Sequence, residues 1–436
     1  MAQKIQGCED LYGDQMRLWQ HAVAVARSIF DTFGFEMIET PALEQVATFV
    51  HGIGESSDVV RKEMFRVYSA ALLDGVMQHG SEDHLKAKQR MALRPEGTAG
   101  VVRACVEHNF IQGGANDTRL WYAEAMFRGE RPQKGRLRQF HQIGVEWLAA
   151  PDPAADAECI MMLMKFYTTM GIPLDKLQLR INSMGDTECR PAYRALVQAY
   201  IKKHADSMCE DCLERAEINP LRVFDCKNET CQAIMQDAPL YRDHLCDACA
   251  EHYVQTKHFL DQLHLSYIED PTLVRGLDYY TRTVFEVECP DAGVGAIGGG
   301  GRYDNLVELE GGHPCCGLGW ALGFERVALA LAALNVEPPA PSFPFVYVAY
   351  TSQQERMYAF SVSNMLRDSH IRCESSYQMR SLKAQFKQAD KYNARYCVVI
   401  GEAEVAANEV TLRDMQTHEQ ERVALDELAA KLKARM

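Results

Sequence analysis

The most informative stretch of this sequence is Arg275-Gly276-Leu277-Asp278-Tyr279-Tyr280. Paired tyrosines next to an arginine and an acid suit a small ligand that is both polar and aromatic. Strand-like residues follow at 283–287, and four glycines then stand in Ala296-Ile297-Gly298-Gly299-Gly300-Gly301-Arg302-Tyr303-Asp304. Glycines let a ligand or a second strand approach the backbone closely. This run is not a nucleotide P-loop, because no Gly-Lys-Ser/Thr follows it, and a tight hairpin without a ligand is the alternative.

A second polar cluster is expected on a strand that covers residues 137–148. Side chains alternate between the two faces of a strand, so Gln142 and Glu146 point the same way. Gly144 stands between them and would leave room for a ligand over the sheet. His141 faces the opposite side and is interpreted as a packed or surface histidine.

A carboxylate and a hydroxyl flank a glycine in Arg94-Pro95-Glu96-Gly97-Thr98, just after a predicted strand end. Glu96 and Thr98 could both contact a ligand there. Alternatively, either side chain caps the helix that is expected to begin near Ala99.

Cations gather on the loop that joins the predicted strands 120–127 and 137–148, in Phe127-Arg128-Gly129-Glu130-Arg131-Pro132-Gln133-Lys134-Gly135-Arg136. Arg128 could hold a phosphate through its guanidinium fork. The loop cations Arg131, Lys134 and Arg136 could meet the phosphates of a nucleic-acid end. A solvated hairpin with internal salt bridges is the alternative.

These segments together resemble the class II aminoacyl-tRNA synthetases, and within them the histidyl-tRNA synthetases. The region of Thr40-Pro41 resembles the first class signature, Phe127-Arg128-Gly129-Glu130 the second, and Gly319-Trp320-Ala321-Leu322-Gly323-Phe324-Glu325-Arg326 the third. Arg275–Tyr280 and Ala296–Tyr303 resemble the two histidine-specific signatures. The resemblance implies an α+β fold, with an antiparallel sheet flanked by helices that binds ATP and histidine side by side.

The resemblance also implies roles for individual residues in joining L-histidine to tRNA(His) through a histidyl-adenylate. Arg128 and Arg275 would hold the α-phosphate from two sides, while Glu130 and Arg326 would fix ATP, with Mg²⁺ on the pyrophosphate portion. In the histidine pocket, Glu96 and Thr98 would contact the α-ammonium group, and Gln142 would contact the carboxylate with Arg275 close by. Glu146 and Tyr280 would bond the imidazole nitrogens. Tyr279 and Tyr303 would line the pocket. Arg128, Arg275, Gln142 and Glu96 are the predicted catalytic set.

Four segments are expected along the chain. Residues 1–183 and 269–336 would form the catalytic core, 184–268 a mostly helical insertion, and 343–436 a small α/β domain like the anticodon-binding domain of this subclass. The proline-rich Glu337-Pro338-Pro339-Ala340-Pro341 would link them. Lys383, Lys387 and Lys391 recur at steps of four, so on a helix they form a basic stripe for RNA. A solvated helix face is the alternative.

The composition limits the compartment and the metal chemistry. The chain has 436 residues, a net charge of -14 and 15 cysteines, with no secretion signal and no apolar run long enough to span a membrane. A cytosolic enzyme with reduced thiols is expected. The pairs Cys209/Cys212 and Cys246/Cys249 could together build a four-cysteine zinc site. We favour free thiols there, because the two pairs lie further apart than in a compact zinc ribbon.

Two other functions are compatible with parts of this pattern. A non-catalytic paralogue that regulates histidine biosynthesis would have eroded signatures and no terminal domain, whereas both look intact here. Other class II synthetases, such as the prolyl and threonyl enzymes, share the terminal domain but not the Arg275–Tyr280 segment. Cys8 and Trp320 depart from the usual residues of the family, at positions without an assigned chemical role. A homodimer is expected from the resemblance alone.

Overall fold

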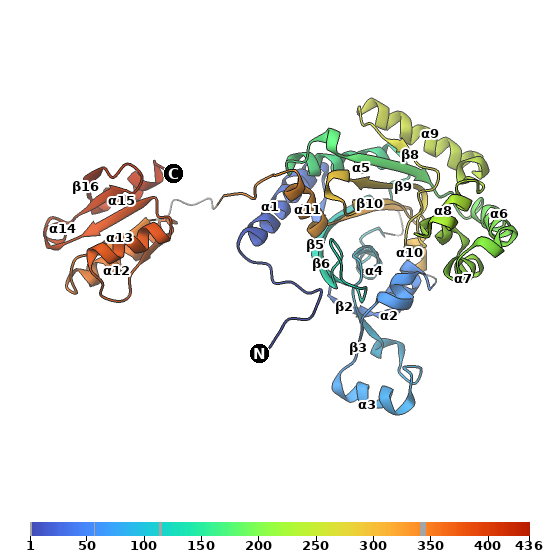
Figure 1. Ribbon diagram of the computed structural model, residues 1–436, viewed down its shortest axis with the longest axis horizontal. Helices are drawn as coiled ribbons and strands as arrows, with labels where there is room; N and C mark the ends of the chain where they lie inside the picture. The colour runs from blue at the N-terminus through green and yellow to red at the C-terminus, as the bar shows by residue number, and fades with distance from the viewer. Residues whose placement is uncertain (1, 56, 113–115, 341–345) are drawn as a thin grey trace. The chain divides into compact units, whose positions relative to one another are not determined.

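The computed structural model describes residues 2–55, 57–112, 116–340 and 346–436 (Figure 1). They form two compact units, Met1–Pro338 and Pro339–Met436, which we describe separately. Pro341 of the expected linker and the first residues of the expected 343–436 domain lie outside the described residues. The division of the first unit into a core and an insertion at 184–268 stays a prediction.

An eight-stranded sheet organises the first unit. Its strand order is β1 (Glu36–Met37), β5 (Thr118–Phe127), β6 (Gln139–Leu148), β11 (Gly317–Gly323), β10 (Ala296–Arg302), β9 (Thr281–Glu288), β7 (Gln178–Ser183) and β8 (Ile268–Glu269). Only the outermost pairs, β1–β5 and β7–β8, are parallel. The six central strands pair antiparallel, which confirms the expected sheet.

Helices cover one face of this sheet: α1 (Gly13–Phe30), α5 (Pro153–Thr169), α9 (Asp247–Gln262) and α11 (Phe324–Ala333) (Figure 1). Ile143 and Val145 of β6 point into the core beneath them, as the alternation of the strand predicts. Because α9 packs there, the last helix of the expected insertion shares the core of the catalytic sheet. At the edge of the sheet, β1 has only two residues.

The opposite face carries the polar side chains of β6. It is bordered by α2 (Val46–Ile53), α4 (Thr98–Glu107), α10 (Leu306–Leu309) and a small sheet of β2 (Leu43–Gln45), β4 (Met91–Leu93) and β3 (Arg66–Val67), with α3 (Ala70–His79) beyond β3. Three further helices lie in the expected insertion, namely α6 (Arg190–Lys203), α7 (Glu210–Ile218) and α8 (Glu229–Met235).

The second unit has a five-stranded sheet in the order β13 (Cys373–Ser375), β12 (Val346–Tyr350), β14 (Tyr396–Ile400), β15 (Glu409–Asp414) and β16 (Gln420–Ala424). α12 (Glu355–Asp368) and α15 (Leu425–Lys433) pack on one face, α13 (Leu382–Lys391) packs on the other, and α14 (Glu402–Ala407) follows β14. The expected small α/β fold is confirmed.

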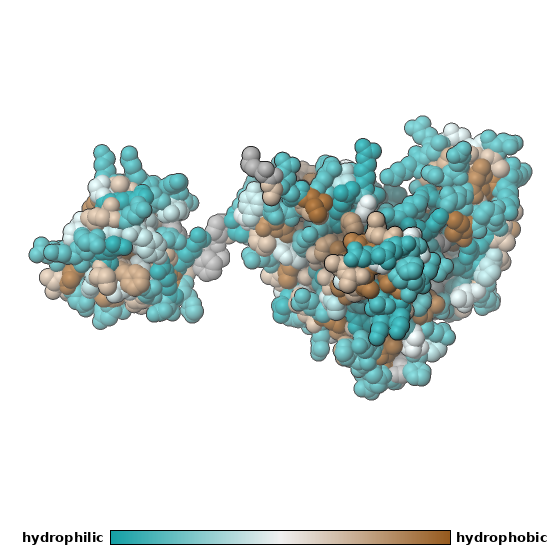
Figure 2. All heavy atoms as spheres, turned by 90° about the horizontal axis from the view of Figure 1, so that it is seen from below, coloured by the Kyte–Doolittle hydropathy of each residue, from teal (hydrophilic) through white to brown (hydrophobic). Residues whose placement is uncertain are grey.

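The surface drawn in Figure 2 is mostly hydrophilic, with hydrophobic residues singly or in small groups. Within the described ranges, every helix is too short or too polar to cross a membrane.

Candidate active site

A buried carboxylate lies at the centre of the polar face of the large sheet. Glu146 on β6 is 1% exposed and accepts three hydroxyl hydrogen bonds. Thr98 Oγ1 donates to its Oε1 at 2.7 Å, Tyr122 Oη donates to Oε1 at 3.4 Å, and Tyr303 Oη donates to Oε2. Such a cluster fixes the carboxyl group and leaves its electrostatics sensitive to what binds next to it.

Two carboxyl groups of this buried cluster hold protons more tightly than usual. Burial raises the pKa of Glu146 to about 8, although the hydroxyls of Tyr303 and Thr98 act in the opposite direction. Burial also raises the pKa of Glu96, against the backbone N–H groups of Ala99 and Thr98. Perturbed acids in one pocket are typical of functional sites.

Three tyrosines belong to the same buried cluster. The rings of Tyr279 and Tyr280 lie 4.6 Å apart, and the Tyr279 ring meets that of Tyr303 edge-on at 5.6 Å. All three are buried, and the Arg275 guanidinium lies 5.4 Å from the centre of the Tyr280 ring. The structure therefore brings the two glycine- and tyrosine-containing segments together around Glu146.

The sequence suggested open space for a ligand above Gly144, but the structure shows that this space is filled. Tyr122 stands opposite Gly144 on β5, and a Cβ atom on this glycine would lie 2.4 Å from Tyr122 Cζ. A Cβ on Gly97 would meet the same ring at 2.3 Å. Both glycines make room for Tyr122, which our sequence interpretation missed, and any ligand must bind beside that ring.

Glu96 caps a helix, as one of the two sequence interpretations allowed. Its carboxylate accepts the backbone N–H groups of Thr98 at 2.8 Å and Ala99 at 2.9 Å, at the start of α4. Both carboxylate oxygens of Glu96 accept these capping hydrogen bonds, and the carboxyl group stays within the buried cluster. Thr98, the other candidate, directs its hydroxyl to Glu146 instead.

A cationic cleft of about 200 Å³ adjoins this cluster, because Arg275 lines the cleft and lies against Tyr280. Four arginines line it together with Gln142, Gly298 and Gly299, namely Arg128, Arg136, Arg275 and Arg326. Arg128 Nε donates to Pro95 O at 2.9 Å, and Arg326 donates to the carbonyls of Gly135 at 2.8 Å and Ala296 at 2.7 Å. These backbone contacts fix the arginines, so their remaining N–H groups can face an anion without further ordering.

Two buried polar atoms in the cleft lack a partner among the described residues: Gln142 Oε1 and Arg275 Nε. Buried polar atoms normally form hydrogen bonds, so unpaired ones beside a cleft are expected to bind a ligand. Arg275 also forms an ion pair with Glu286. Glu286 was missed from the sequence, because nothing local distinguishes it from any other strand acid.

The loop cations take different positions. Arg131 and Lys134 are exposed, and Lys134 Nζ donates to Ala292 O at 3.2 Å. Arg136 instead lines the cleft and pairs with Glu130 at 3.2 Å. It therefore belongs with the other cleft arginines, although it stands in the loop sequence. Lys383, Lys387 and Lys391 are exposed on α13, where the expected helix is present.

The cysteines form two clusters, and not the one that the sequence suggested. Cys209 and Cys212 lie with Cys226 and Cys231, whereas Cys246 and Cys249 lie with Asp186 and Cys189. The single zinc site that the two Cys-x-x-Cys pairs could have built together, which we did not favour, is therefore not formed. Sequence spacing failed here because chain topology brings distant cysteines to each pair.

Comparison with known proteins agrees with this geometry. The family model described as histidyl-tRNA synthetase matches residues 7–327, and that of an anticodon binding domain matches residues 345–435. The histidine--tRNA ligase of Caldanaerobacter subterraneus subsp. tengcongensis is 39% identical over 428 residues, covering 98% of both chains. That of Anaeromyxobacter dehalogenans is 42% identical over 430 residues, with the same coverage.

A solved structure extends the agreement to the whole fold. The apo histidyl-tRNA synthetase of S. aureus is 32% identical, with a TM-score of 0.80, covering 99% of this chain and 100% of that one. From its signatures, its fold and these relatives, the chain belongs to the histidyl-tRNA synthetase family.

Proposed function

We propose that this protein charges tRNA(His) with L-histidine in two steps that use ATP. The observation that carries the proposal is the junction of two sites. A cleft lined by Arg128, Arg275 and Gln142 adjoins the buried polar cluster around Glu146, because Arg275 also lies against Tyr280 of that cluster. A phosphate group held in the cleft and an amino acid held at the cluster can therefore react with each other.

In the first step, the histidine carboxylate attacks the α-phosphate of ATP and pyrophosphate leaves. Negative charge grows on the phosphoryl oxygens during attack, so cations already in place stabilise the transition state more than the ground state. Arg128 and Arg275 serve this role, with Gln142 orienting the carboxylate and Arg326 and Glu130 positioning the nucleotide. Arg136 joins them as a further phosphate contact, because it lines the same cleft.

Selection of histidine depends on the pairing of both ring nitrogens. Glu146 and Tyr280 would bond the imidazole, Glu96 and Thr98 the α-ammonium, and Tyr279 and Tyr303 would close the wall. An apolar analogue would leave these buried groups unpaired, and such sites can discriminate by roughly 10⁴-fold or more.

Magnesium fits the cleft by its donor set, since the Glu130 carboxylate lines it together with the arginines. Mg²⁺ on nucleotides is usually held by one or two carboxylates together with phosphate oxygens. The bound ion would neutralise charge on the pyrophosphate portion.

In the second step, the terminal ribose hydroxyl of the tRNA takes the histidyl group from the adenylate. Arg131 and Lys134 are exposed on the loop beside the cleft and are proposed to contact the acceptor end. The basic stripe of Lys383, Lys387 and Lys391 is proposed to contact the anticodon arm. A homodimer and a cytosolic location are further parts of the proposal, supported by the family resemblance.

Pyrophosphate exchange tests the proposal. Radiolabelled pyrophosphate should enter ATP only when L-histidine is present, and histidyl-tRNA should form when tRNA(His) is added. Histidine-dependent exchange distinguishes the enzyme from a regulatory paralogue, which would bind histidine without exchange. Exchange that depends on proline or threonine would assign a different substrate.

A further inference from the structure

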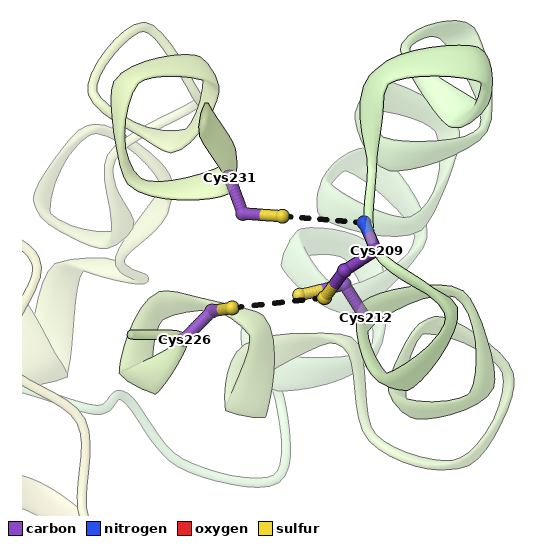
Figure 3. Close-up of side chains that lie close together, drawn as sticks. All are labelled: Cys209, Cys212, Cys226 and Cys231. Atoms are coloured by element: carbon purple, nitrogen blue, oxygen red, sulfur yellow. Dashed lines mark hydrogen bonds between the residues drawn. The ribbon is translucent and has the colours of Figure 1, made fainter. Parts of the chain in front are cut away.

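Four thiols converge where α7, α8 and the segment between them meet (Figure 3). Cys209 immediately precedes α7, Cys212 lies in its first turn, Cys231 lies in α8, and Cys226 stands between the two helices. Their Sγ atoms all lie within 4.8 Å of one another, and Cys209 Sγ is 3.8 Å from Cys226 Sγ. All fifteen cysteines are free thiols, so none of these contacts is a disulfide.

These distances fit a single tetrahedral ion. With Zn–S bonds of about 2.3 Å, two sulfurs of a tetrahedron stand roughly 3.8 Å apart. Four thiolates without oxygen or nitrogen ligands select zinc over the harder cations. Backbone N–H groups already point at the sulfurs, from Cys209 to Cys231 Sγ at 3.3 Å and from Asn228 to Cys226 Sγ at 3.4 Å. Such N–H donors stabilise thiolate charge, as outer contacts do in metal sites.

A second cluster lies where the segment between β7 and α6 meets the start of α9. Asp186, Cys189, Cys246 and Cys249 place their ligand atoms within 4.8 Å of one another. Cys189 Sγ is 4.0 Å from Cys249 Sγ, and Cys246 Sγ is 3.8 Å from Asp186 Oδ2. Three thiolates and one carboxylate are also a tetrahedral zinc set.

Both clusters adjoin contacts to the segment that carries the histidine-specific tyrosines. Between Cys212 and Cys226, Asn219 Nδ2 donates to Asp278 Oδ1 at 2.7 Å and Arg222 donates to Arg275 O at 3.2 Å. Next to Cys189, Arg190 donates to Asp278 O at 3.3 Å and to Tyr280 O. Each cluster therefore ties together the ends of an insertion segment whose side chains hydrogen-bond to residues 275–280.

We propose that the protein binds two structural zinc ions, one in each cluster, and that they brace the insertion against residues 275–280. This goes beyond the proposed aminoacylation, because the ions would take no part in either chemical step. Structural zinc contributes directly to folding free energy, so the bracing is expected to be lost when the metal is removed.

Metal analysis of the full-length protein, purified without added metal, tests the two sites. We expect close to two zinc ions per chain. Cys226→Ser and Cys189→Ser should each remove one ion, and the double variant both. Cys105→Ser and Cys373→Ser are matched controls, since both residues are buried thiols outside the clusters. Both controls should keep two ions.

A spectroscopic measurement covers the case in which the serine variants do not fold. Cobalt exchanged into the wild-type protein should give thiolate charge-transfer bands and tetrahedral d–d bands at two equivalents. Less than a few tenths of a metal ion per chain, or iron in place of zinc, would overturn the proposal. A single zinc ion lost only in Cys226→Ser would overturn the second site.

Hydrogen exchange tests the bracing without any activity measurement. Removal of zinc by a chelator should accelerate amide exchange in residues 275–280, while amides of β12 and β14 in the other unit stay unchanged. Zinc loss with no change in 275–280 would overturn the bracing role. Because metal content and exchange need no substrate, their failure is distinguishable from failure of the proposed aminoacylation.

Discussion

The hydroxyl of Thr98, at the start of α4, donates a 2.7 Å hydrogen bond to the buried carboxyl group of Glu146 on β6. The two residues are 48 positions apart, and the bond joins a helix start to the middle of the sheet. It links the proposed binding site of the α-ammonium with that of the imidazole. A change at Thr98 should therefore be felt at the ring end of the histidine as well.

Thr98→Val keeps the shape of the side chain but removes the donor. Leaving a buried acceptor without its hydroxyl costs about 1–3 kcal/mol, so the KM for histidine should rise by roughly 10-fold or more. Thr98→Ser is the matched control and should stay within a few-fold of the wild type. Steady-state pyrophosphate exchange measures both, and equal defects in the two variants would show that the hydroxyl is not the cause.

The raised pKa of Glu146 predicts a pH-dependent stability of the free protein. The carboxyl group holds its proton up to about pH 8 when folded but loses it near pH 4.5 when unfolded. The native state therefore binds more protons in this window, so Glu146 alone should lower the free energy of unfolding as pH rises from about 5 to 8, by at most about 1.4 kcal/mol per pH unit.

Glu146→Gln removes this one titration and leaves the others in place. Urea unfolding at several pH values should give a smaller decline of stability for the variant than for the wild type. Above pH 8 the two curves should run parallel. A difference between them that does not change from pH 5 to 8 would contradict the raised pKa.

Much of the fold can be predicted from the spacing of apolar residues, because these residues mark the buried face of each strand and helix. The alternation along β6 predicts that Ile143 and Val145 face the helices, and the structure places them there. The alternation of polar and apolar residues at 35–41 predicts a longer strand than the two residues of β1. Thr40 gives its N–H to Glu124 and not to a strand, and Pro41 has none to give.

The candidate site was harder to predict where the register between two strands decides which side chains meet. Tyr122 enters the pocket because it stands opposite Gly144, a relationship that neither strand encodes alone. The partners of the two Cys-x-x-Cys pairs could not be predicted for a related reason. Cys189 meets Cys249 across 60 positions, so adjacent spacing could not reveal the partners.

Arg275→Ala should slow adenylation far more than it weakens histidine binding. Loss of one donor at a developing charge typically costs about 3–4 kcal/mol, so the single-turnover rate should fall by roughly 10²–10³-fold. The variant also leaves Glu286 unpaired beside the phosphates, which should raise the KM for ATP.

The double variant Arg275→Ala/Glu286→Gln separates the two effects. It should recover much of the ATP affinity, since the unpaired charge is gone, but not the rate. Rapid-quench measurement of adenylate formation gives both quantities. Recovery of the rate in the double variant would mean that Arg275 acts only by neutralising Glu286.

The basic stripe on α13 should affect tRNA and not adenylation. Reversing the charge of Lys383 and Lys387 should raise the KM for tRNA by roughly 10-fold or more. The salt dependence of binding should also weaken, because each phosphate that a lysine no longer neutralises lowers the salt slope by close to one unit. Pyrophosphate exchange, which needs no tRNA, should be unchanged.

Lys433→Glu on α15, compared with the single variant Lys387→Glu on α13, provides a control with an equal change of charge. α15 packs on the opposite face of the five-stranded sheet, and Lys433 is exposed there, so a general effect of charge would appear in this variant as well. A defect confined to α13 assigns the RNA contact to that face, because the two helices share the same sheet and differ in the side they cover. Equal defects from α13 and α15 would instead mean that net charge alone controls binding, and the stripe would be an ordinary solvated helix face.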